Sequence, residues 1–128
     1  DYSVQQLIYK DNGETTVIDF ETAKKLPIIW EVMRSYSYID GKAKNGELHI
    51  DTLEEYVKKF ENYVPLNEYD LKYAAQLYLI QIVSSTFGYK QYNDNYAKTE
   101  LLEFALFRTN LCRYLYNNLE KISARLQE

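Results

Sequence analysis

Hydrophobic and polar positions change their period once along this chain, close to Asp19. Between Leu7 and Ile18 two short apolar runs, LIY and TTVI, are separated by the polar run KDNGE. Such runs on either side of an Asn-Gly pair are typical of a β-hairpin, because both turn positions tolerate a positive φ. The sequence therefore predicts one two-stranded hairpin here.

Beyond Asp19 the apolar positions recur at intervals of three and four residues, which predicts helices. The first follows Pro27 as IIWEVMRSYSYI and ends at Asp40-Gly41, where a polar loop that we expect to be exposed runs through Gly46.

The second helix covers TLEEYVKKFENYV and stops at Pro65. Asp51 is its predicted cap, and Glu54 three residues later completes a capping box. Its apolar residues fall along one face: Leu53, Val57, Phe60 and Val64.

The third helix opens at Asn67 with Asp70 and ends at Gly88. It has one apolar stripe and further apolar residues on its other side, so we expect it in the middle of a bundle. The stripe comprises Leu71, Ala74, Ala75, Tyr78, Leu79 and Ile82, and the other side Leu77, Ile80 and Val83.

After the polar run YKQYNDN, a last long helix is predicted from about residue 96 to 126. Its apolar positions are Leu101, Ala105, Cys112, Leu115, Leu119, Ile122 and Leu126. The predicted fold is mainly α, a short β-hairpin followed by a helical bundle, within one domain.

Composition excludes several classes of function. A chain of 128 residues with net charge −4 and a pI near 5.1 lacks the basic face of a nucleic-acid binder, so no nucleic-acid partner is expected. No run of 18 apolar residues and no leader-like N-terminus is present, so no membrane partner is expected. The single cysteine, Cys112, suits a reducing cytoplasm and is expected to be buried and inert. The 14 tyrosines favour amphipathic packing over a ligand cage.

Candidate chemistry lies where the chain enters and leaves the hairpin. Asp1 and Gln6 lead into the first strand and Asp19 follows the second, so the hairpin brings two carboxylates and an amide to one end. Oxygen ligands of this kind suit a magnesium-phosphate site. The alternative is that these acids serve only solubility and capping.

These residues resemble the catalytic core of the protein-kinase-like small-molecule phosphotransferases, the group of aminoglycoside phosphotransferases, choline kinases, homoserine kinases and methylthioribose kinases. Their loop reads His-Gly-Asp or His-Asn-Asp, with Asn five residues after the Asp, and is followed by a hairpin and an Ile-Asp-Phe/Trp-Glu/Asp step. Here DYSVQQ is similar to the loop from its aspartate onward, VIDFE to the metal-binding step and PIIWEVMRSY to the helix that follows. The motifs cover about residues 1 to 40. The helices after them match only as a C-terminal helical lobe.

The resemblance implies ATP and Mg²⁺ as cofactors and the hydroxyl of a small molecule as acceptor. Asp1 would be the catalytic residue that orients or accepts the proton of that hydroxyl, and Asp19 would hold magnesium against the nucleotide phosphates. Gln6, at the family's asparagine position, would be a second ligand. Glu21 is either a third ligand or an acid in the first turn of a helix.

Three departures from the family pattern bear on activity. Gln6 is one methylene longer than asparagine, and Ser3 stands where bacterial loops often have histidine. No glycine-rich loop or strand lysine precedes Asp1, so residues 1–128 are expected to be the C-terminal lobe of a longer kinase, inactive on their own.

Other polar residues give weaker indications of a functional role. His49 has no second His or Cys near it in the sequence, which favours a structural or exposed role over a metal site. Glu31 is expected to support the loop or to be solvated. The helix acids Glu54, Glu55, Glu61, Glu68, Asp70, Glu100 and Glu103 are expected on the solvated surface, and if some of them line the acceptor cleft they favour a cationic acceptor. An aromatic contact from Tyr36 or Tyr38 to a quaternary amine is a further hypothesis.

Three classes of function follow from the sequence. The first is a cytoplasmic small-molecule kinase, the second a pseudokinase-like module that binds nucleotide without transfer, and the third a helical interaction domain without catalysis. Neither the acceptor nor the oligomeric state can be read from the sequence.

Overall fold

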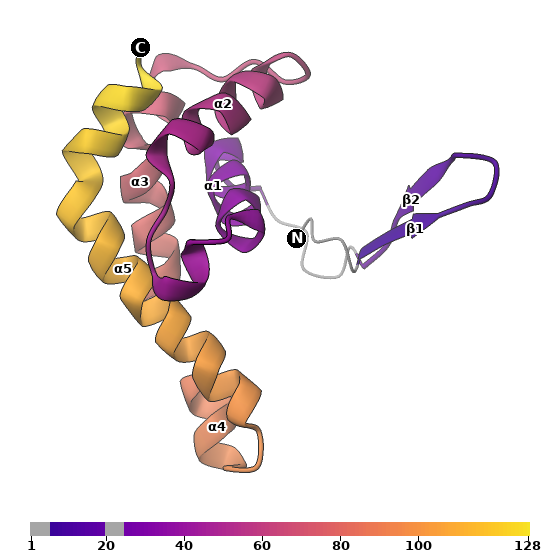
Figure 1. Cartoon of the computed structure of the whole chain (residues 1–128), viewed down its shortest axis with the longest axis vertical. Coiled ribbons are helices and arrows are strands. Elements are labelled where there is room, and N and C mark those ends of the chain that lie inside the picture. Colours follow the sequence, from indigo (N-terminus) through magenta and orange to yellow (C-terminus); the bar gives the residue numbers. More distant parts are fainter. Residues whose placement is uncertain (1–5, 20–24) are drawn as a thin grey trace.

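The computed structural model describes residues 6–19 and 25–128, and these form a hairpin and a set of helices. The strands are β1 (Leu7–Tyr9) and β2 (Thr15–Val17), followed by α1 (Ile28–Ile39), the 3-10 turn η2 (Ala43–Asn45), α2 (Ile50–Glu61), α3 (Glu68–Val83), α4 (Tyr89–Asp94) and α5 (Thr99–Leu126) (Figure 1). The prediction of a mainly helical fold with one short hairpin is confirmed.

The hairpin is antiparallel, with Leu7 opposite Val17 and Tyr9 opposite Thr15. Its turn is wider than the two-residue Asn-Gly turn, because Lys10 N–H donates to the Glu14 carbonyl and only Gly13, at φ 84°, has a positive φ. The hairpin was predicted, but the turn chemistry was not.

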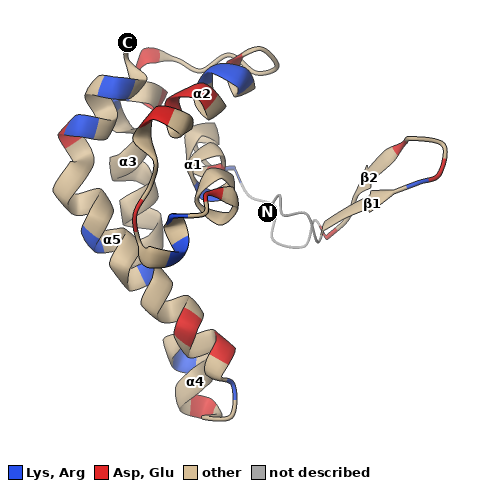
Figure 2. Cartoon of the chain, viewed as in Figure 1, with Lys and Arg blue, Asp and Glu red and all other residues tan. Residues whose placement is uncertain are grey.

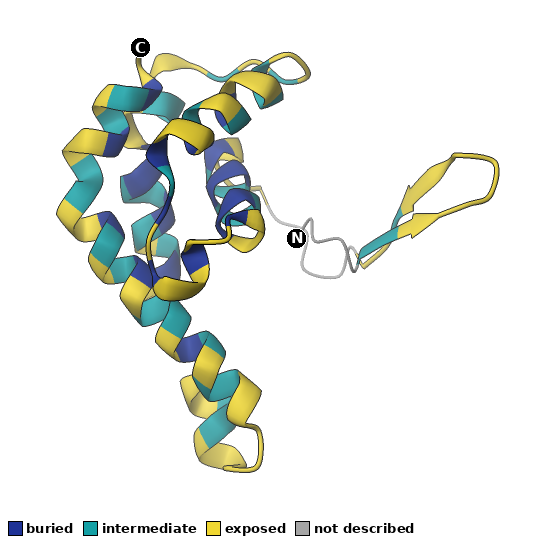
Figure 3. Ribbon diagram, viewed as in Figure 1, coloured by how far each residue is buried: buried dark blue, intermediate teal, exposed yellow. Residues whose placement is uncertain are grey.

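The hydrophobic core lies among the helices, where α3 packs against both α1 and α5. Figure 3 shows the buried residues gathered there, whereas the hairpin is largely exposed. The most deeply buried large side chains are Ile29, Met33, Leu53, Leu111, Leu115 and Ile122. A polar link crosses this core, since the Tyr78 hydroxyl lies 2.6 Å from Ser37 Oγ, which itself donates to the Arg34 carbonyl.

α2 begins differently from the prediction. The helix starts at Ile50 with His49 at the N-cap position and no capping side chain, so the predicted capping box of Asp51 and Glu54 is wrong. Asp51 already lies within the first turn of the helix, and both acids form ion pairs with Arg125 instead. α2 also ends at Glu61, before Val64.

α3 begins as predicted, because Asn67 accepts from Asp70 N–H while the Asp70 carboxylate accepts from Asn67 N–H. Ala74, Ala75, Tyr78 and Ile82 are buried as the stripe predicted. Of the residues predicted on the other side, Leu77 is partly buried against the core, but the expectation is wrong for Ile80 and Val83, which are 63% and 67% exposed. Among the described residues, no helix covers that side.

The loop after α1 is exposed only in part, at Gly41, Lys42, Lys44 and Asn45. Ala43 and Gly46 are buried, and Gly46 has φ 78° with its Cα so close to α5 that an added Cβ would lie 2.8 Å from the Asn110 carbonyl carbon. A glycine is required here both for the conformation and for the close approach.

The C-terminal region holds one helix that the sequence analysis missed. YKQYND forms α4, which packs against α5, and Gly88 allows their close contact. α5 starts at Thr99 and changes direction at Asn118, whose φ is −126° and whose side chain donates to the Tyr114 carbonyl.

Lys and Arg are interspersed with Asp and Glu along the described helices (Figure 2). In residues 6–19 and 25–128, no helix combines the length and the apolar character that crossing a bilayer requires.

Candidate functional site

Gln6 and Asp19 are neighbours at the open end of the hairpin. The ladder extends one bond beyond the strands, because Ile18 N–H donates to the Gln6 carbonyl at 2.9 Å. This pairing places Gln6 Nε2 3.5 Å from Asp19 Oδ2, although the residues are 13 positions apart in the chain. The hairpin thus brings together the amide and the carboxylate that the family resemblance assigns to one metal ion.

The backbone at Asp19 has an unusual conformation. Its φ of 67° is the only positive φ of a non-glycine residue within the described ranges. The left-handed region costs an ordinary residue about 1–2 kcal/mol, although Asp and Asn tolerate it better than most. Residues held in such conformations cluster at active sites and ligand clamps. Asp19 therefore combines a candidate role from its sequence context with a backbone feature typical of functional residues.

Two of the predicted site residues, Asp1 and Glu21, lie outside the described residues. The approach of Asp1 to Asp19 and the choice of role for Glu21 stay predictions. Within the described ranges no three His, Cys, Asp or Glu side chains gather as a metal site.

The donor set at the hairpin end is compatible with magnesium only as part of a larger complex. Mg²⁺ takes oxygen ligands and is usually bound through one or two carboxylates, with water and substrate phosphates in the remaining positions. Asp19 offers a carboxylate, and the Gln6 amide offers an oxygen once its amide is turned over. These two residues would hold the ion, and nucleotide phosphates would complete its coordination.

Next along the chain, α1 carries side chains that are already paired. Arg34 binds Glu31 with Nη2 2.9 Å from Oε1, and its guanidinium lies 5.3 Å from the Tyr38 ring centroid. Burial raises the pKa of Tyr36 to about 12, and its hydroxyl donates to the His49 carbonyl and contacts Thr52. The hypothesis that Tyr36 contacts an amine ligand is therefore wrong, because the residue is only 4% exposed. Tyr38 is 45% exposed, but Arg34 already occupies a place over its ring.

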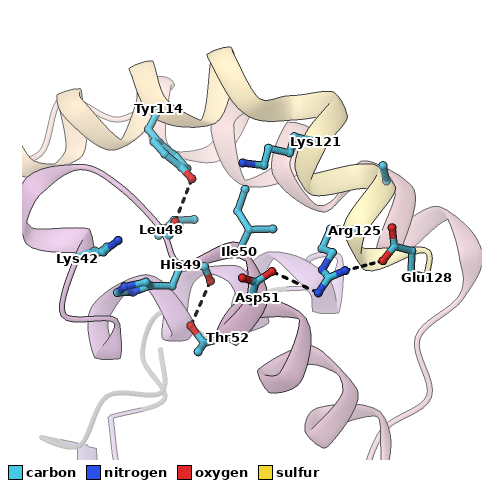
Figure 4. A pocket seen from close by; sticks show the side chains of 11 residues that line it. Lys42, Leu48, His49, Ile50, Asp51, Thr52, Tyr114, Lys121, Arg125 and Glu128 are labelled. Carbon is cyan, nitrogen blue, oxygen red and sulfur yellow. Dashed lines mark hydrogen bonds and ion pairs between the residues drawn. The ribbon is translucent and has the colours of Figure 1, made fainter.

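A second feature is a hollow of about 620 Å³ between α5 and the start of α2. Figure 4 shows Tyr114, Lys121 and Arg125 descending from α5, opposite the segment from Leu48 to Thr52, with Lys42 at one end. Arg125 is held by Asp51, Glu54 and Glu128, so the charges of the hollow largely balance. The Tyr114 hydroxyl closes one wall by donating to the Leu48 carbonyl.

His49 at the edge of this hollow is oriented by a buried acid. Asp40 Oδ1 lies 2.7 Å from His49 Nδ1, and Oδ2 accepts the His49 backbone N–H at 2.8 Å. Burial by itself would raise the pKa of Asp40, but these bonds and one from Lys42 N–H outweigh it, and the pKa is lowered. The structural role expected for His49 agrees with this geometry. The sequence signal for the pair was weak, because its residues are nine positions apart across a loop.

Comparison with known proteins finds no match for this chain among protein-family models, curated proteins or solved structures.

Proposed function

We propose that this chain carries the acceptor-binding and metal-binding part of an ATP-dependent phosphotransferase that acts on the hydroxyl of a small molecule. The observation that supports the proposal is the position of Gln6 beside Asp19, with Asp19 in the left-handed backbone region. The motif resemblance of residues 1 to 40 supplies the reaction class.

In this proposal each residue has a separate task. Asp19 and Gln6 hold Mg²⁺ against the nucleotide phosphates, and Asp1 orients the acceptor hydroxyl and takes its proton. The metal ion would neutralise charge on the phosphates during transfer. Phosphoryl transfer depends mainly on positioning and charge neutralisation, so two carboxylates and an amide are sufficient protein groups on this side of the site.

The acceptor proposed is an aminoglycoside, choline, homoserine or a similar alcohol. Among the described residues, the exposed acids Glu55, Glu68, Glu100 and Glu103 are consistent with a cationic acceptor only if some of them face the site. The resemblance implies a nucleotide-binding lobe upstream of residues 1–128, so the proposed transfer reaction belongs to the full-length protein.

A second candidate function is nucleotide binding without transfer. Gln6 favours it, because the additional methylene moves the amide oxygen outward from the position that asparagine would give it. Gln6→Asn separates the two candidates. If the wild-type protein is already an optimal kinase, the Gln6→Asn variant keeps the wild-type transfer rate or loses some of it. If the protein is a pseudokinase-like module, the wild type with Gln6 shows no transfer.

The test is a screen of the full-length protein with MgATP and a panel of aminoglycosides, choline, homoserine and methylthioribose, scored by phosphorylated product. We expect transfer to one acceptor class, and a loss of at least about 10²-fold in kcat for Asp19→Ala. Asp11→Ala is the matched control, because Asp11 is an exposed acid in the turn at the other end of the same hairpin. Transfer that survives Asp19→Ala would remove the proposal.

A further inference from the structure

The outer face of α3 carries a regular stripe of side chains that are exposed except at its centre, where Gln76 is partly buried. Tyr69, Tyr73, Gln76, Ile80 and Val83, here called the outer stripe, follow one another at intervals of four, three, four and three residues. Tyr69, Ile80 and Val83 are each more than 60% exposed, and Tyr73 is 40% exposed. The buried residues of α3, among them Ala74 and Tyr78, lie on the opposite side of the helix.

Alternating intervals of four and three residues place side chains along one line of a helix and match the seam of a helix pair. Several large exposed apolar and aromatic side chains along one line of a helix are typical of an interaction site. The partner that suits such a line is another helix packed along α3.

The outer stripe is symmetric about its centre. If a second α3 is laid antiparallel with Gln76 opposite Gln76, Tyr73 comes opposite Ile80 and Tyr69 opposite Val83. We propose that the outer stripe is the contact between two copies of this chain, related by a twofold axis that passes close to Gln76. A twofold contact uses the same patch on both copies, as this order of residues requires.

Charges at the two ends of α3 support the antiparallel arrangement. Glu68 and Asp70 stand in its first turn. Arg108 lies at its last turn, where its guanidinium donates to the Ile82 carbonyl and to Ser85 Oγ. Antiparallel packing sets the acids of one copy beside the arginine of the other and also opposes the two helix dipoles, whereas parallel packing sets like charges side by side.

One further feature fits a twofold contact. Beyond Val83, a hollow of about 290 Å³ lined by Val83, Phe87 and Arg108 lies where the Tyr69 ring of the other copy would approach.

The length of α3 limits the strength of this contact. A helix of 16 residues is about 24 Å long, so one helix pair covers less than the roughly 800 Å² per partner that stable complexes bury. We therefore expect a dimer with a dissociation constant in the micromolar range, formed in a concentration-dependent way.

Sedimentation equilibrium of the 128-residue chain from about 1 µM to about 500 µM tests the association. Wild type should pass from monomer to dimer, and Ile80→Glu should weaken dimerisation by at least about tenfold, because it places two charges in an apolar contact. Ile39→Glu is the matched control, since Ile39 at the end of α1 is 60% exposed and lies outside the outer stripe. It should dimerise like wild type. Far-UV circular dichroism checks that each variant is helical.

Disulfide trapping tests the orientation, in a Cys112→Ser background that removes the native thiol. Gln76→Cys should cross-link to itself, because residues on the axis come within disulfide range. Tyr69→Cys should not, because its two copies would lie about 21 Å apart along the helix axis. A wild-type chain that stays monomeric at every concentration overturns the proposal. So does association that Ile80→Glu leaves unchanged, and so does trapping through residue 69 instead of residue 76.

Discussion

The Asp40 carboxylate bonds both the ring and the backbone of His49, at 2.7 Å from Nδ1 and 2.8 Å from the main-chain nitrogen. Asp40 follows the last residue of α1 and His49 precedes the first residue of α2. One buried carboxylate therefore links the end of α1 to the residue that precedes α2.

Replacing Asp40 by Asn should lower the free energy of unfolding by about 2 kcal/mol at neutral pH, because it weakens three hydrogen bonds to a charged acceptor that is 3% exposed. Urea unfolding measures the change. Asp51→Asn is the control, with an expected change below about 0.5 kcal/mol, since Asp51 is 87% exposed.

The same bonds predict a pH dependence. The pKa of Asp40 in the folded chain lies below its ordinary value of 3.8. The stabilisation is therefore complete above that value and is lost as the pH falls through the folded pKa. The difference in unfolding free energy between wild type and Asp40→Asn should shrink as the pH is lowered below about 4. A difference that is constant from neutral to acid pH would contradict this account of Asp40.

Gly46→Ala should destabilise the chain by more than about 2 kcal/mol, since the new Cβ would lie in a left-handed backbone position and 2.8 Å from the backbone of Asn110. Gly41→Ala, in the same loop with open space around it, should change stability by less than about 0.5 kcal/mol. Thermal unfolding of both variants gives the comparison. Equal losses would show that the loop does not pack on α5 as described.

Asp19→Gly should strengthen the hairpin while removing the proposed metal ligand. Glycine adopts a φ of 67° without steric cost, so the hydrogen bond from Ile18 N–H to the Gln6 carbonyl should open less often. The amide exchange rate of Ile18 should therefore fall by about fivefold. Asp19→Val should have the opposite effect, because a β-branched residue is strained there. Unchanged exchange in both variants would mean that Asp19 is not held in the left-handed region.

Local patterns in the sequence were enough to predict the hairpin, the helical fold and the start of α3. Asn67 and Asp70 are three residues apart, so their capping bonds depend on local geometry alone. The start of α2 was mispredicted for the opposite reason. Asp51 resembles a cap locally, but its partner Arg125 lies at the far end of the chain, and no short-range pattern indicates that ion pair.

The exposed side of α3 shows the limit of periodicity. A helix that is apolar on both sides is predicted to be buried on both sides, but only one side of α3 has partners within the described residues. Periodicity identifies which faces avoid water and does not say whether the covering surface belongs to the same molecule.

The candidate site was predictable in part. The strand register that joins Gln6 to Asp19 follows from the lengths of the two apolar runs around the turn, so their proximity could be expected. The left-handed conformation of Asp19 could not, because it depends on how the chain leaves the hairpin.

Paramagnetic broadening by Mn²⁺ tests the proposed metal site at the hairpin end most directly. In amide NMR spectra of the 128-residue chain, millimolar Mn²⁺ should broaden the resonances of Asp19 and of the Gln6 side-chain amide first, and Asp19→Asn should abolish the effect. Broadening that begins instead at Asp11 and Glu14 in the turn, or that persists in Asp19→Asn, would contradict the assignment of Asp19 as a metal ligand.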